Sequence, residues 1–155
     1  MIAVVAIAVV AGIAIPMHFG RSEVTLENAA ILLARDLRAT QNNAAYMGRT
    51  MTISFDEDGG GYRVVDEHGK VVEHPRTGRD FVRRYQRDGV FEGVFVRLVD
   101  LGGDRALVYD ERGFALESGK VELVFERDSR ELFVDEHSGG VHIPGSTTGW
   151  KDPGI

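Results

Sequence analysis

The chain contains no cysteine among its 155 residues. Disulfide bonds, thiol catalysis and zinc–thiolate centres are therefore excluded. Positive charge is not in excess either, because the net charge is −6. Nucleic-acid binders are usually basic, since much of their affinity comes from neutralising phosphates. Nucleic acid is thus not the expected partner, although a local basic patch could still bind it.

The motifs that mark common enzyme classes are also missing. The Gly59–Gly61 run is not followed by Gly-Lys-Ser/Thr, so it is not a phosphate-binding loop. The serines lack the context of a nucleophile elbow, and no histidine pair has the i, i+4 spacing of a helical metal site. The acidic run Asp56–Asp58 favours a solvated turn over a calcium loop. We therefore expect no enzyme activity, no cofactor and no metal centre.

The most distinctive feature is an apolar N-terminus. Residues 1–17 read MIAVVAIAVVAGIAIPM and include no charged or polar side chain. As a helix this segment would be about 26 Å long, slightly short of a hydrocarbon core of about 30 Å. Gly12 and the alanines allow helices to approach closely, and Pro16 is tolerated in membrane helices. The residues expected to carry membrane insertion and helix packing are Ile2, Val5, Val9, Gly12, Ile13 and Pro16.

Three interpretations of this segment compete. A cleaved secretory signal needs a basic region before its apolar run, and no Lys or Arg precedes this one. A core helix or strand would need covering on every side. A membrane helix whose first turns precede Met1 fits best.

A second helical pattern follows directly. Residues 22–47 carry apolar and small side chains at steps of three and four, which predicts one buried face, and Gly48 is expected to end the helix. The predicted face comprises Leu26, Ala30, Leu33, Leu37, Thr40, Ala44 and Met47. With the apolar segment, this makes a nearly continuous helix of about 70 Å, with a bend expected at Pro16 or Gly20.

The rest of the chain alternates short strand patterns with turn residues, which is typical of an antiparallel meander or sandwich. Strands are expected at residues 49–56, 62–66, 70–73, 81–85, 90–99, 105–110, 120–125, 131–135 and 141–143. The fold class is therefore α+β, with a long N-terminal helix, first apolar and then amphipathic, packed on an antiparallel β-rich head. We divide the chain into a membrane and assembly helix (1–21), the amphipathic helix of the head (22–48), the β head (49–143) and a flexible tail (144–155).

This layout resembles the type IV pilin superfamily. The resemblance rests on Gly-Ile-Ala-Ile-Pro at 12–16 and on Leu-Ala-Arg-Asp-Leu-Arg-Ala-Thr-Gln at 33–41. Arg-Thr-Met-Thr-Ile-Ser-Phe at 49–55 and the run 114–143 are similar to H-type minor pseudopilins (GspH) and FimT-like minor pilins. The family's processing site, a glycine ahead of a Thr-Leu-Ile-Glu-like run, would fall before Met1. We therefore expect a truncated N-terminus or a subunit that is not processed normally.

The resemblance implies a structural subunit of a type II secretion pseudopilus that assists protein export across the outer membrane. It implies a single-pass protein of the bacterial inner membrane, methylated as in that family, with its head in the periplasm. The implied partners are other pseudopilins through the N-terminal helix, membrane lipid and the secreted substrate. The alternative is a minor type IV pilin that acts in pilus assembly or DNA uptake.

One basic concentration supports the DNA alternative. It consists of Arg76, Arg79, Arg83, Arg84 and Arg87, with Phe81 and Tyr85 interleaved. Arginines with aromatic side chains can bind a single nucleic-acid strand. Asp80 and Asp88 dilute the charge, so a solvated strand face is the favoured interpretation. A third hypothesis, an exported enzyme or ligand-binding β domain with a signal anchor, would need convergent polar groups in a pocket, and the sequence offers no such set.

Overall fold

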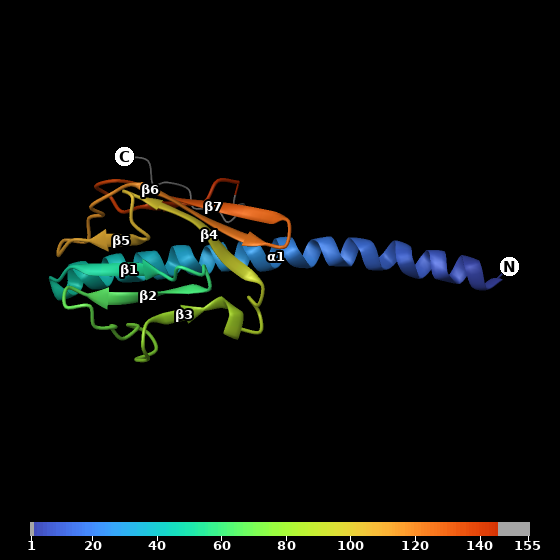
Figure 1. Ribbon diagram of the computed structural model, residues 1–155, viewed down its shortest axis with the longest axis horizontal. Coiled ribbons are helices and arrows are strands. Elements are labelled where there is room, and N and C mark those ends of the chain that lie inside the picture. The colour runs from blue at the N-terminus through green and yellow to red at the C-terminus, as the bar shows by residue number, and fades with distance from the viewer. Residues whose placement is uncertain (1, 146–155) are drawn as a thin grey trace.

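One helix dominates the molecule. This computed structural model describes the backbone of residues 2–145 and the side-chain surroundings of residues 24–145 apart from Leu98. Helix α1 (Ile2–Met47) has 46 residues, which corresponds to about 69 Å at 1.5 Å per residue. Its C-terminal half lies along a β-rich head and its N-terminal half extends beyond the head (Figure 1). The helix runs without interruption through Pro16 and Gly20, where the sequence predicts a bend.

The buried face of α1 follows the predicted period. Six of the seven predicted positions are buried, namely Leu26, Ala30, Leu33, Leu37, Thr40 and Ala44. The prediction is wrong for Met47, which is 51% exposed. Met47 is the last helical residue, and Gly48 follows it in the left-handed region at φ +60°. Glycine adopts this conformation without the Cβ penalty, which ends the helix as predicted.

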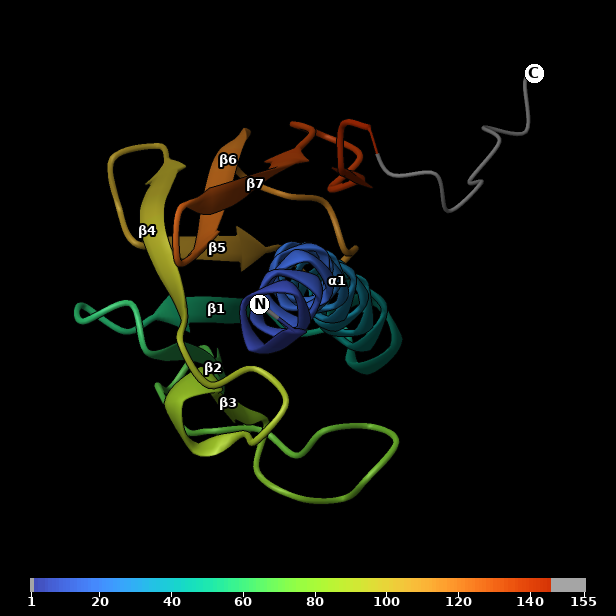
Figure 2. The same cartoon turned by 90° about the vertical axis from the view of Figure 1, so that its right-hand side faces the viewer.

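The head contains two four-stranded antiparallel sheets. The first sheet has the order β3-β2-β1-β5 and the second has the order β4-β6-β7-β8. Viewed along the helix, the two sheets occupy different sides of α1 (Figure 2). The first sheet comprises β1 (Met51–Phe55), β2 (Gly61–Asp66), β3 (Val82–Arg84) and β5 (Ala106–Tyr109). The second comprises β4 (Val94–Leu101), β6 (Gly119–Phe125), β7 (Asp128–Val134) and β8 (Val141–His142), and a 3-10 turn η1 (Tyr85–Arg87) follows β3.

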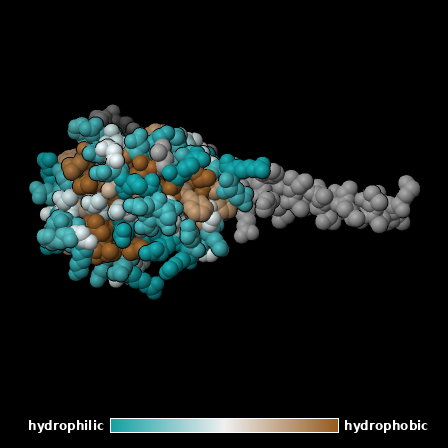
Figure 3. Space-filling view, in the orientation of Figure 1, coloured by the Kyte–Doolittle hydropathy of each residue, from teal (hydrophilic) through white to brown (hydrophobic). Residues whose placement is uncertain are grey.

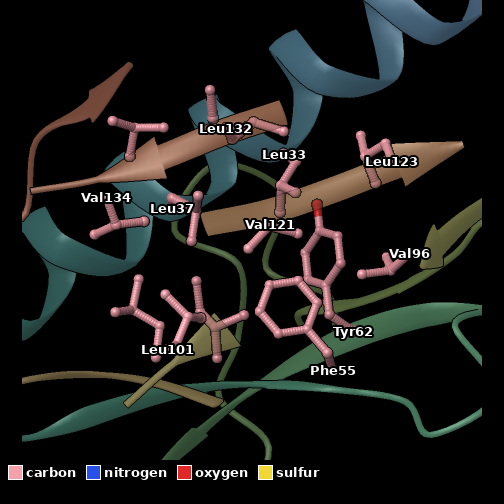
Figure 4. Close-up of a cluster of buried hydrophobic side chains, with 14 of the residues drawn as sticks. Leu33, Leu37, Phe55, Tyr62, Val96, Leu101, Val121, Leu123, Leu132 and Val134 are labelled. Atoms are coloured by element: carbon pink, nitrogen blue, oxygen red, sulfur yellow. The ribbon is translucent and has the colours of Figure 1, made fainter. Parts of the chain in front are cut away.

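A single hydrophobic core joins the helix to both sheets. Leu33 and Leu37 of α1 are fully buried, and they point into the same cluster as Phe55 and Tyr62 of the first sheet and side chains of the second (Figure 4). The residues that the second sheet contributes to this view are Val96, Leu101, Val121, Leu123, Leu132 and Val134. The amphipathic half of α1 docks here because its apolar face and the apolar faces of both sheets are removed from water together.

Three strand predictions need correction. Residues 70–73 form isolated bridges at Val71 and Glu73 and no strand. The strand expected at 90–99 begins only at Val94, because the chain first passes through η1 and a turn closed by the Val94 N–H bond to Phe91 O. Strand β7 begins at Asp128 and not at residue 131, because the turn before it contains only Glu126 and Arg127. Residues 146–155 of the predicted tail lie outside the described residues.

Candidate functional site

The first candidate site is the part of α1 that does not lie against the head. The six residues expected to carry insertion and packing, Ile2 to Pro16, all belong to this helix, and their side chains lie outside the described surroundings. Leu26 is the first residue of α1 that the structure shows as buried, whereas Val24 is 61% exposed. Among the helix residues whose side-chain surroundings are described, contact with the head thus begins at Leu26, and the N-terminal half of the helix extends beyond the head (Figure 1).

Within the part of the chain that the structure describes, no helix has an apolar stretch long enough to cross a membrane. The assignment of residues 1–21 to a membrane stays a prediction. The visible face of the head carries mainly hydrophilic side chains with scattered hydrophobic ones (Figure 3). Among the described large hydrophobic residues, Tyr46 near the end of α1 has the highest exposure, at 87%.

A buried carboxylate fixes the docked half of the helix. Asp36 is 0% exposed. Its Oδ2 accepts hydrogen bonds from Tyr62 Oη at 2.9 Å and from Arg83 Nε at 2.7 Å. A buried charge is tolerated when it is paired and hydrogen-bonded in this way. Asp36 thus ties α1 to both β2 and β3.

His74 approaches the same carboxylate from the segment between β2 and β3. Its Nε2 lies 3.8 Å from Asp36 Oδ1, and its ring lies 4.4 Å from the Phe81 ring, centroid to centroid. His74 Nδ1 accepts a hydrogen bond from the Arg76 backbone N–H at 3.1 Å. Because Nδ1 acts as the acceptor here, Nε2 is the ring nitrogen that faces Asp36.

The ionisation of this cluster is set by burial and by Asp36. Burial, together with the neighbouring Tyr85 and Asp36, raises the pKa of Tyr62 well above its usual value. The hydrogen bond to Asp36 raises the pKa of Arg83, and burial raises the pKa of Tyr85. Tyr62 therefore remains a hydrogen-bond donor and Arg83 remains a cation at physiological pH. The group is suited to holding three elements together and does not resemble a catalytic acid–base pair.

Polar side chains of α1 also hold the helix to the second sheet and its loops. Gln41 Nε2 donates to Gly113 O at 2.8 Å and to Ser138 O at 2.6 Å. Arg38 Nη2 donates to Val141 O at 3.1 Å. Neither side chain belongs to the predicted buried face of the helix. Together with Asp36 they fix the direction in which the free half of α1 leaves the head.

The predicted basic patch is divided by the fold. Arg83 binds Asp36, whereas the other four arginines, Arg76, Arg79, Arg84 and Arg87, are exposed. Phe81 and Tyr85 are both 1% exposed, so the prediction that they could stack on nucleic-acid bases is wrong. The strand pattern of residues 81–85 explains this result, because alternate side chains face the core. Whether the arginines bind nucleic acid stays a prediction.

Sequence reasoning missed the Asp36 cluster. Its members come from residues 36, 62, 74 and 83, which the fold brings together. One signal was present, because Asp36 lies three residues after Leu33 and four before Thr40 and so falls on the buried face. Within the described residues, no group of three or more acidic or histidine side chains is placed to hold a metal ion.

A long N-terminal helix packed against antiparallel β-sheets defines an α+β, pilin-like fold. The crystal structure of the type IV minor pilin FimU from Pseudomonas aeruginosa strain PAO1 shares this fold, with a TM-score of 0.54 and 16% sequence identity. The match covers 76% of this chain and 87% of the FimU chain. No family model matches the sequence, and no curated protein matches it.

Proposed function

We propose that the chain is a structural, non-enzymatic subunit of a pilin-like filament. In this proposal the first half of α1 inserts into the bacterial inner membrane and later packs against the same helix of neighbouring subunits, while the head faces the periplasm. The observation that carries the proposal is the division of α1. Its docked half begins at Leu26, and the half that extends from the head begins with the apolar residues 1–17. Apolar side chains at that density need a covering of lipid or other helices.

Two kinds of filament could contain this subunit, a type IV pilus or a type II secretion pseudopilus. The similarity to FimU favours a minor type IV pilin. The resemblance of residues 49–55 and 114–143 to H-type minor pseudopilins favours the second candidate, a type II secretion pseudopilus subunit that assists export across the outer membrane. Deletion in the producing bacterium separates them, because loss of surface pili supports the first and retention of exported proteins in the periplasm supports the second.

The variant Val9→Asp tests the membrane step. A charged residue at the centre of a membrane helix costs about 2.5–3.5 kcal/mol. The Ile and Val residues of the segment contribute roughly 2–5 kcal/mol to insertion, so a single aspartate offsets most of it. We expect the full chain to sediment with membranes and the variant to move largely to the soluble fraction, as measured by fractionation and immunoblotting.

The matched control is Asn42→Asp, which adds the same charge to an exposed position of the same helix. This variant is expected to fractionate like the unmodified chain. Recovery of the unmodified full chain in the soluble fraction would contradict the proposed membrane insertion.

A further inference from the structure

A pocket lies between α1 and the segment that joins β2 to β3. Its volume is about 360 Å³. In the view along the helix, this segment swings out beyond the first sheet and passes on the side of α1 away from β6 and β7 (Figure 2). The pocket is lined by Arg35, Asp36, Ala39, His74, Pro75 and Arg76.

The mouth of this pocket is positively charged. The charge of Asp36 is already compensated by Arg83, with 2.7 Å between Nε and Oδ2. Arg35 and Arg76 are both exposed, and neither side chain has an ion-pair partner among the described residues. Residues 70–87 contain six basic and two acidic side chains. This is a local excess of positive charge on a protein whose net charge is −6.

A rigid acidic turn projects from another side of the head. The turn between β1 and β2 carries Asp56, Glu57 and Asp58 and no basic residue. Asp58 Oδ1 accepts a hydrogen bond from the Gly60 N–H at 2.8 Å, and a Cβ on Gly59 would lie 2.5 Å from Val96 O. The turn is therefore packed tightly against β4. Figure 2 shows the acidic turn on the side of the first sheet away from the helix, whereas the segment that joins β2 to β3 lies beside the helix.

We propose that the acidic turn of one copy docks at the basic pocket of the next copy, with Glu57 and Asp58 facing Arg35 and Arg76. This inference rests on the proposed filament function. Because the two surfaces differ and lie on different sides of the head, the contact is head-to-tail and does not form a two-fold dimer, and its repetition extends along a filament unless the rotation closes it into a ring. Exposed ion pairs are individually weak and are screened by salt. The contact therefore orients heads that the packed helices hold together.

Disulfide cross-linking tests this contact directly, because the chain has no cysteine of its own. Two full-length copies with different tags are co-expressed, one with Thr77→Cys and the other with Glu57→Cys, and membranes are oxidised. Thr77 adjoins Arg76 and is exposed, so both pocket arginines are kept. A disulfide requires the two Cα atoms to approach within about 7 Å. We expect the cross-linked dimer to exceed, about fivefold or more, that from a control pair with Glu111→Cys in place of Glu57→Cys.

The charges are tested in the same assay. Adding Arg35→Glu and Arg76→Glu to the Thr77→Cys copy is expected to reduce the cross-linked product to the control level. A product that persists after this reversal overturns the inference. If the two tags co-purify but the Thr77–Glu57 disulfide does not form, the inference is wrong and the filament proposal stands. If the tags do not co-purify and no disulfide forms, both are contradicted.

Discussion

The variant Arg83→Met is expected to lower the free energy of unfolding by about 3 kcal/mol, at the low end of the range for breaking a buried ion pair. The reason is that Asp36 remains in place, fully buried, and among the described side chains only the Tyr62 hydroxyl is then left within hydrogen-bond distance. His74 Nε2 is 3.8 Å away and does not replace the lost bonds. The low end of the range applies because the Arg83 side chain is 31% exposed and partly screened by water.

Chemical denaturation of the full chain in detergent, followed by circular dichroism, measures this change. The control Arg84→Met removes the adjacent arginine of β3, which is exposed, and is expected to change stability by no more than about 0.5 kcal/mol. Adding Asp36→Asn to Arg83→Met removes the uncompensated charge and is expected to recover part of the loss. Equal stability of the two single variants would show that Arg83 does not neutralise Asp36.

The variant Leu33→Ala is expected to cost about 3–5 kcal/mol, the range for removing a leucine from a packed core. Leu33 is 0% exposed, and it points into the cluster that contains Tyr62 and Val121 (Figure 4). Truncation removes apolar contacts and leaves a cavity that the rigid sheets on either side cannot fill. Because total stability is about 5–15 kcal/mol for a typical domain, this variant approaches complete loss of the fold.

The same denaturation measurement compares Leu33→Ala with Leu116→Ala. Leu116 is 56% exposed, so the identical chemical change there is expected to cost less than about 1 kcal/mol. A small cost at Leu33 would mean that the docked half of α1 contributes little to the head. The direction of the free half would then not be fixed by the core.

The helix and most strands were predictable because they depend on local patterns. The steps of three and four from Leu26 to Ala44 predicted the buried face, and Gly48 predicted the end of α1. Alternating apolar residues located β1, β2 and β6 within one or two residues. The strand predicted at 90–99 was wrong at its start, because residues 90–93 form a turn and β4 begins at Val94.

The division into two sheets and the Asp36 cluster depend on contacts between distant residues. Strand β1 pairs with β5 and β4 pairs with β6, so the order of strands cannot be read from consecutive hairpins. Asp36 and Arg83 are 47 residues apart. Each is a charged residue of a type that usually lies on the solvated surface. Their ion pair becomes visible only once the fold places the side chains of β2 and β3 next to Asp36 of α1.

In the proposed filament, the free half of α1 packs against the same helix of neighbouring copies. Single cysteines placed in turn at positions 2 to 16 of the full chain, followed by oxidation in intact membranes, test it most directly. Packing of helices predicts dimers whose yield peaks every three to four residues, in line with 3.6 residues per turn. Cysteine at exposed Asn42 should give little dimer. A uniform absence of dimers from position 2 to position 16 would contradict the claim.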